Sequence, residues 1–139
     1  MILLDTNVIS ELVCPAPDPA VVGFLRQQVP DSVYTAAVCV AEIQHGLARM
    51  PVGHRRDDLT ARMTTLLAIA FENEVLPFDG QCAAFYGEIR AGREAAGKPI
   101  TVEDAMIAAT VRAHGAALAT RNLADFEDTG IQLVNPWTP

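Results

Sequence analysis

The chain has 139 residues, half of them hydrophobic, with 17 acidic and 10 basic residues and a net charge of -7. This length suits one compact domain spanning residues 1–139 and leaves no room for a second. The acidic excess disfavours binding of nucleic acid by overall charge, because such affinity comes mostly from neutralised phosphates; a nucleic-acid partner would need a local basic patch or a cation.

The start of the chain has neither the basic region nor the long apolar run of a secretion signal or membrane span. We therefore expect a cytoplasmic protein with no membrane association. The three cysteines, Cys14, Cys39 and Cys82, are widely spaced and contain no C-x-x-C pair, so we expect reduced residues that are buried or half-buried.

The first half of the chain predicts strands that alternate with helices. Residues 1–4 are short, branched and apolar, which indicates a buried strand, and residues 8–13 suit a short helix. Three prolines within five residues end that helix, and Asp18 followed by Pro19 predicts the start of the next, over 18–29. The remaining elements expected here are a strand over 32–37 and helices over 38–50 and 55–73.

The second half continues this alternation. Small and apolar residues over 102–115 indicate a buried helix that ends at a glycine. The other expected elements are a strand over 74–78, a helix over 80–96, a strand over 116–120, a loop over 121–128 and a strand over 131–135. Strands that alternate with helices predict an α/β fold, with a mainly parallel sheet covered on both faces.

Four acidic residues fall near the ends of predicted strands or near the starts of predicted helices. Asp5 ends the first strand, Glu42 is near the start of the helix after the second, Asp104 is in the first turn of the buried helix, and Asp125 follows the 116–120 strand. Taken singly, each could be only a helix cap, and Thr101 stands at capping-box spacing from Asp104. Ligand sites of parallel sheets form at the carboxyl ends of the strands, so all four acids can be placed on one rim.

Acids that converge in this way need a counter-ion. Two carboxylates about 4 Å apart repel by roughly 4 kcal/mol at an effective dielectric of 20, so they must shift their pKa values or bind a cation. Oxygen ligands select a hard ion such as Mg²⁺ or Mn²⁺. Such an ion activates water and neutralises charge on phosphate, which is typical of phosphodiester cleavage.

The segments "LLDTNVISEL", "AEIQHGLAR" and "ITVEDAMIAATVRAHGAALATRNLADF" together resemble the PIN-domain ribonucleases, specifically the VapC-type toxins of toxin–antitoxin pairs and their FitB-like relatives. The resemblance runs from end to end of the chain and keeps the order Asp, Glu, Asp, Asp. It implies a three-layer α/β/α PIN-like fold and endonucleolytic cleavage of RNA with Mg²⁺ or Mn²⁺. It also implies a homodimer and inhibition by a VapB-like antitoxin whose tail enters the acidic groove.

The resemblance carries Asp5, Glu42 and Asp104 over as catalytic metal ligands. Many members of the family have an acidic residue where this chain has Asn122, which leaves Asp125 as the substitute fourth ligand. One metal position would then be weak or water-mediated.

Four polar residues would support these acids. Thr6 and Thr120 would orient a carboxylate or a water by hydrogen bonds, and Asn7 and Asn122 could do the same. For Thr6 and Asn7, capping of the first helix is the alternative, and the two roles are compatible.

Nine of the ten basic residues are arginines, which suit bidentate contacts with phosphate. Arg121 adjoins the site loop and is the best candidate for RNA contact. Flanking contacts are possible from Arg49, Arg55, Arg56, Arg90, Arg93 and Lys98, although surface ion pairs explain any single one of these as well. Glu42 and His45 have the Glu-x-x-His spacing of di-iron bundles, but no second copy exists.

Three other functions remain to be weighed. A receiver-like phospho-acceptor module is disfavoured because "KP" precedes the Thr120 strand instead of following it, and an aspartyl-nucleophile phosphatase because Asn7 stands where a second acid is usual. The main alternative is a weak or inactive PIN scaffold that binds an antitoxin and acts in a regulatory DNA-binding complex. The RNA target cannot be read from the sequence, since recognition of structured RNA depends on shape.

Overall fold

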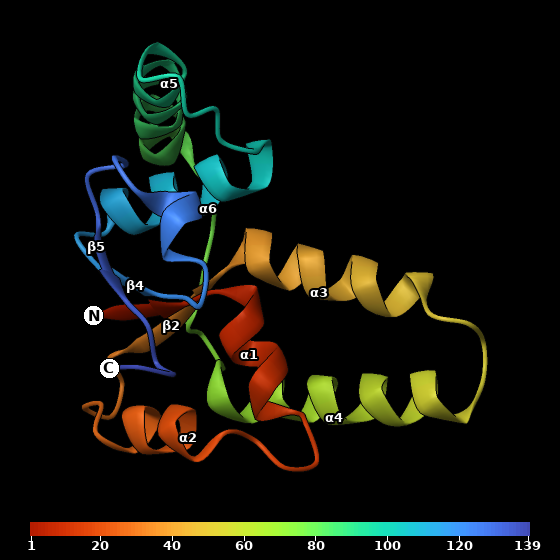
Figure 1. Ribbon diagram of the computed structural model, residues 1–139. Coiled ribbons are helices and arrows are strands. Elements are labelled where there is room, and N and C mark those ends of the chain that lie inside the picture. The colour runs from red at the N-terminus through yellow and green to blue at the C-terminus, as the bar shows by residue number, and fades with distance from the viewer.

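The computed structural model describes residues 1–139 as a five-stranded sheet with helices on both faces (Figure 1). The strands are β1 (Ile2–Leu4), β2 (Val33–Ala36), β3 (Val75–Leu76), β4 (Ala117–Ala119) and β5 (Gln132–Val134). All four pairings are parallel, in the order β3-β2-β1-β4-β5. The predicted parallel sheet is confirmed.

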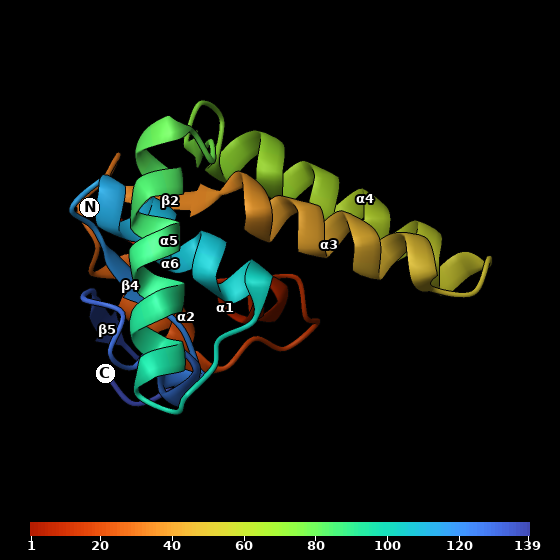
Figure 2. The same cartoon turned by 90° about the horizontal axis from the view of Figure 1, so that it is seen from above.

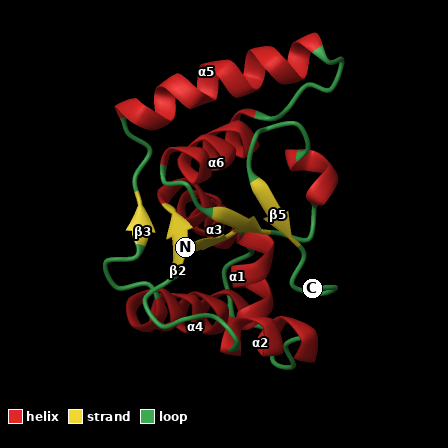
Figure 3. Ribbon diagram, turned by 90° about the vertical axis from the view of Figure 1, so that its left-hand side faces the viewer, coloured by secondary structure: helices red, strands yellow, loops and turns green.

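The helices form the two outer layers of the fold. They are α1 (Thr6–Leu12), α2 (Pro19–Arg26), α3 (Ala37–Arg49), α4 (His54–Ala70), α5 (Gly80–Ala95) and α6 (Val102–Ala113), with a 3-10 turn at Leu123–Phe126. Figure 3 shows α5 and α6 on one side of the sheet and α1, α2 and α4 on the other. None of the helices is both long and apolar enough to cross a membrane.

The central strand β1 is buried on both faces, and its side chains alternate between two cores. Leu3 packs in the core beneath α5 and α6, whereas Ile2 and Leu4 pack in the core that α1, α2 and α4 cover. Strand β4 divides in the same way, with Leu118 in the first core and Ala119 in the second. This period of two is the reason why a run of consecutive apolar residues forms a strand here.

Helices α3 and α4 run side by side and extend away from the sheet (Figures 1 and 2). These two helices form an arm whose base packs in both cores. Cys39 packs in the first core, and Ile43, Leu47 and Met63 pack in the second. Its far end is exposed, and Val52 in the connecting loop keeps 91% of its surface accessible. Because α3 begins directly after β2, its first turns lie just beyond the carboxyl end of that strand.

The strand order reverses at β1. The chain places β2 and β3 on one side of β1, then returns to place β4 and β5 on the other. In sheets of this kind the crevice beside the reversal point is where ligands bind. Asp5 follows β1 and Thr120 follows β4, so both residues stand at this crevice.

Several predicted boundaries were wrong for local reasons. Helix α2 ends at Arg26 instead of residue 29, because Pro30 disfavours a helical conformation at Val29. Strand β3 has only two residues, since Pro77 has no amide to donate to the ladder. Cys39 and Cys82 are buried and free as expected, but Cys14 is exposed, because it lies in the proline-rich turn beyond α1.

Arg93 of α5 is a buried arginine without a carboxylate partner. Its guanidinium donates hydrogen bonds to the carbonyls of Lys98 at 2.6 Å, Asp125 at 3.0 Å and Glu127 at 2.8 Å. The suggested RNA contact by Arg93 was therefore wrong. Its planar fork instead fastens the loop after β4 to α5.

We expect Arg93→Lys to lower the free energy of unfolding by about 2 kcal/mol, because one ammonium cannot reproduce the three forked hydrogen bonds from a buried side chain to backbone carbonyls. Urea unfolding followed by circular dichroism measures this loss. Arg90→Lys is the matched control on the same helix, where the half-exposed side chain has Tyr86 and Glu94 as its polar partners. Equal losses in the two variants would contradict the fastening role of Arg93.

Candidate active site

Asp5 occupies the junction between β1 and α1. Its amide donates to the carbonyl of Ala119 in β4 at 2.9 Å, and its carboxylate caps α1 by accepting from the amide of Thr6 at 2.8 Å. The other carboxylate oxygen accepts from the hydroxyl of Thr120 at 2.8 Å and from the amide group of Asn7 at 3.4 Å. Thr120 and Asn7 thus contact the carboxylate that they are predicted to orient. The residue that caps α1 is Asp5 itself.

Thr120 and Asn7 extend this network into the loop after β4. The Thr120 hydroxyl accepts from the side-chain amide of Asn7 at 3.3 Å and from the backbone amide of Asn122 at 3.1 Å. The side-chain oxygen of Asn7 accepts from the amide of Arg121 at 3.2 Å. Hydrogen bonds therefore join the end of β1 to the loop over residues 120–122.

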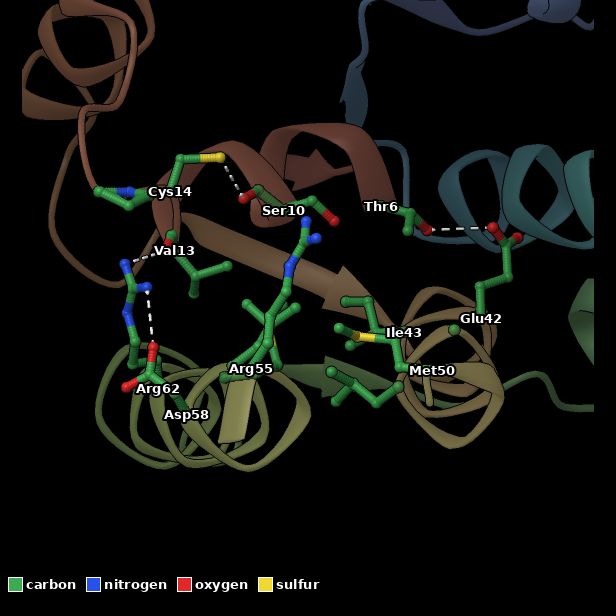
Figure 4. Close-up of a pocket in the computed structure, with 15 residues that line it drawn as sticks. Thr6, Ser10, Val13, Cys14, Glu42, Ile43, Met50, Arg55, Asp58 and Arg62 are labelled. Carbon is green, nitrogen blue, oxygen red and sulfur yellow. Dashed lines mark hydrogen bonds and ion pairs between the residues drawn. The ribbon is translucent and has the colours of Figure 1, made fainter. Parts of the chain in front are cut away.

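Glu42 points toward this junction from the second turn of α3. Its Oε2 accepts from the hydroxyl of Thr6 at 3.2 Å, which makes Thr6 a partner of Glu42 and not a helix cap (Figure 4). Its other oxygen, Oε1, is buried and has no hydrogen-bond partner. An unpartnered buried carboxylate oxygen is costly, and native structures usually give such an atom a ligand or a water.

Asp104 lies in the first turn of α6. The hydroxyl of Thr101 accepts from the amide of Asp104 at 3.1 Å, which confirms the predicted cap and shows that Thr101 provides it. Burial raises the pKa of the Asp104 carboxyl to about 6, although the Thr101 hydrogen bond lowers it, and the charges of Asp5, Asp125 and Glu103 raise it further. The charges of the other acids thus add to the effect of burial and disfavour ionisation of the Asp104 carboxyl.

Asp125 and Asn122 lie on the 3-10 turn after β4. Asn122 precedes the turn, its side chain makes no hydrogen bond, and both residues are exposed. Buried Phe126 and the bond from Arg93 to the Asp125 carbonyl hold the turn in place. The charge of Asp125 reaches the site, because it raises the pKa values of Asp5 and Asp104.

Each of the four predicted acids is therefore linked electrostatically to at least one of the others. Burial is the largest cause of the raised pKa of Asp5 and of Glu42, and the charge of Asp5 is the next for Glu42. Glu103 is not among the acids predicted from the sequence to form the site, yet its charge raises the pKa values of Glu42 and Asp104. Its position directly before Asp104 was the only available signal.

The donor set suits a hard divalent cation. No three acidic, histidine or cysteine side chains come close enough together to hold one ion as they stand. Mg²⁺ does not require this, since it keeps several waters and is usually bound through one or two carboxylates. The orphaned Oε1 of Glu42 and the raised pKa values of its neighbours are the features that such a cation would relieve.

Two cavities meet at Glu42. One, of about 630 Å³, lies between α1, α3 and α4 and is largely apolar, with Ile43 and Met50 on its wall and Arg55 directed toward α1 (Figure 4). The other, of about 610 Å³, lies between α3 and the start of α6, where Glu42 and Asp104 share it with His45 and Arg49. His45 is exposed on that wall and joins no group that could hold a metal, so the di-iron reading has no support.

The other predicted flanking contacts are mostly engaged within the chain. Arg56 donates to the carbonyl of Met50, Arg90 contacts Tyr86 and Glu94, and Lys98 pairs with Glu127 and Asp128. Arg49 and Arg55 line the cavities beside Glu42. Exposed Arg121 lies in the loop after β4, bonded through its amide to Asn7.

Residues 2–131 match the PIN domain family. The chain is 42% identical over 139 residues to "VapC ribonuclease Y4jK" of Sinorhizobium fredii, covering 100% of this chain and 99% of that protein. It is 39% identical to "Toxin FitB" of Neisseria gonorrhoeae over 99% of both chains. Among solved structures, a chain of FitAB bound to a DNA fragment superposes with a TM-score of 0.91 at 39% identity, covering 100% of this chain and 97% of that one.

The raised pKa values set the pH dependence of stability without metal. Between the ordinary pKa of 3.8 and the folded value of about 6, Asp104 stays protonated in the folded state and ionises in the unfolded one. The raised pKa of Asp104 therefore disfavours folding, and this unfavourable contribution is absent below this pH range and complete above it. In EDTA, the free energy of unfolding should therefore fall as the pH rises through this window, and Asp104→Asn should flatten the fall.

Urea unfolding across this pH range measures the slope. Asp79→Asn is the matched control, because hydrogen bonds from Cys82 and Gln81 lower the pKa of Asp79, so its loss cannot flatten the slope. If the free energy of unfolding changes with pH in the same way for the unaltered chain and for Asp104→Asn, the pKa of Asp104 is not raised in the folded state.

Proposed function

Because the chain belongs to the PIN-domain family, we propose that it is an endoribonuclease that uses Mg²⁺ or Mn²⁺ and acts as the toxin of a toxin–antitoxin pair. Relatives named as a VapC ribonuclease and as a FitB toxin match it over essentially their whole length. The observation that carries the metal dependence is the buried Oε1 of Glu42, which has no partner within the chain and lies among carboxyls with raised pKa values.

The four acids have distinct duties in this proposal. Asp5, Glu42 and Asp104 would hold the cation, and Asp125 would complete the site from the loop after β4. Thr120 and Asn7 orient the carboxylate of Asp5. A bound cation would activate the attacking water and neutralise charge on the phosphate and on the leaving oxygen.

Thr6 has a related positioning role. Its hydroxyl donates to Oε2 of Glu42, which directs that carboxylate toward Asp5. Since Asp5 caps α1 through the amide of Thr6, one residue contacts both acids. Hydrogen bonds from the first turn of α1 therefore hold two proposed metal ligands in place.

Asp125 favours an active enzyme over the inactive scaffold. The alternative rests on Asn122, which leaves the usual fourth acidic position neutral. Asp125 follows three residues later on the same 3-10 turn, and its charge raises the pKa values of Asp5 and Asp104. The site therefore keeps a fourth acid near the others, placed by a loop that Arg93 fastens.

The surface around the acids also suggests where RNA and an antitoxin would bind. Arg121, exposed beside Asn7, would contact RNA phosphate next to the acids. The largely apolar cavity between α1, α3 and α4 opens onto Glu42, so a VapB-like antitoxin segment seated there would block the site (Figure 4). A complex of FitA and FitB on DNA supports regulation with an antitoxin. We further propose a homodimer that works in the cytoplasm.

Asp5→Asn should abolish RNA cleavage and the growth arrest that the toxin causes, because a neutral amide is a poor ligand for a hard cation. The loss should exceed the roughly 10- to 100-fold typical of residues that only orient a metal ligand. The measurement is incubation of the purified chain, freed of antitoxin, with total cellular RNA and Mn²⁺, followed by mapping of the cut ends.

Asp18→Asn is the matched control, because Asp18 also caps a helix but lies away from the acids. It should cleave as the unaltered chain does, and EDTA should stop both. Cleavage that persists in Asp5→Asn or in EDTA would sink the metal-dependent assignment. Intact RNA under every condition, with the chain folded, would favour the inactive scaffold.

A further inference from the structure

Arg121 and Trp137 form a stacked pair at the edge of the site. The guanidinium carbon of Arg121 lies over the indole ring of Trp137, 4.0 Å from the ring centroid. This is the shortest of the three such contacts in the chain; the others, at 4.9 Å and 5.8 Å, involve Arg112 and Arg90. A guanidinium over the face of tryptophan is the most favourable form of a cation–π contact.

The chain end after β5 is shaped to hold the ring. Asn135 accepts from the amide of Thr138 through its carbonyl at 3.1 Å and from the amide of Trp137 through its side chain at 2.9 Å. Pro136 occupies the second position of this turn, where its fixed φ is favourable. Trp137 is half-buried against the core that contains Ile2, and its indole nitrogen is buried without a partner, so packing holds the ring.

The pair is joined to the proposed metal ligands through backbone. The amide of Arg121 donates to Asn7, whose side chain donates to the carboxylate of Asp5. The preceding residue, Thr120, bonds both Asp5 and the carbonyl of Val134 in β5. Arg121 is thus fixed at its backbone by the site and at its side chain by the turn after β5.

The guanidinium of Arg121 keeps its donors free. No carboxylate lies within ion-pair distance of it, and its side chain makes no hydrogen bond. By contrast, Arg62, Arg93 and Arg112 all donate to groups within the chain. An exposed, oriented and unpaired guanidinium, on a residue whose amide is hydrogen-bonded to the Asp5 network, is suited to receive a phosphate.

We propose that Trp137 is a positioning residue that holds Arg121 as the receptor for a phosphate of the RNA substrate next to the bond that is cut. This inference rests on the proposed nuclease function. The ring restricts the long side chain before RNA arrives, so less conformational freedom is lost on binding. Stacking leaves the N–H edge of the guanidinium available to the phosphate oxygens.

Trp137 is the only tryptophan in the chain, so its emission reports on this pair directly. The experiment is a titration of the full chain with a single-stranded RNA oligonucleotide in Ca²⁺ buffer, with the RNA checked afterwards to be uncut. Binding of a phosphate by Arg121 should change the emission saturably. In Arg121→Gln, a labelled oligonucleotide should need roughly tenfold more protein for half saturation.

Kinetics separate positioning from a purely structural role. Trp137→Leu should raise KM for RNA roughly two- to fivefold at unchanged kcat, and Trp137→Phe should fall between it and the unaltered chain. The double variant Arg121→Gln with Trp137→Leu should be no worse than Arg121→Gln alone, because both changes remove one contact. Arg26→Gln, an exposed arginine on α2, is the control and should leave KM unchanged.

Emission that is unaffected by bound RNA would overturn the proposal, as would additive losses in the double variant. If Trp137→Leu is not folded, Trp137→Phe takes its place, and a KM equal to that of the unaltered chain rejects the proposal. Failure of the unaltered chain to cleave any RNA in Mn²⁺ would instead reject the nuclease function on which the inference rests.

Discussion

A buried carboxylate at the end of the central strand is the constraint on which the site depends. Asp5 lies where the strand order reverses, 5% exposed, with hydrogen bonds from the next helix and from the neighbouring strand's end. These bonds fix the direction of the carboxylate but do not remove the cost of burying its charge, since its pKa is still raised. The surrounding acids add to that cost.

The fold keeps these acids near one another despite their repulsion. Helix α3 packs in both cores and carries Glu42 beyond the strand ends. Helix α6 is held by a face of buried residues and brings Asp104 to the same rim. Arg93 fastens the loop that carries Asp125. Packing and neutral hydrogen bonds therefore hold together charges that would separate in a flexible chain, and a cation would relieve this strain.

Much of this arrangement could be predicted from the sequence. The order of elements, the parallel sheet and the capping by Thr101 follow from local patterns, and the position of Asp5 follows from the rule for strand ends. Contacts between distant segments could not be predicted in this way. Arg93 looked like a surface arginine because its carbonyl partners are up to 34 residues away, and the Trp137 stack depends on a turn at the chain end that no periodicity marks.

The proposed cation site is tested most directly by the release of protons when Mn²⁺ is added to the metal-free protein. Because the Asp104 carboxyl has a pKa of about 6, Mn²⁺ binding near that pH should displace a proton, and binding well above it should displace almost none. Saturable release that Asp104→Asn abolishes would confirm that the repelling carboxyls are the cation site. Mn²⁺ binding without proton release near pH 6, or no binding at all, would show that these carboxyls do not form the cation site.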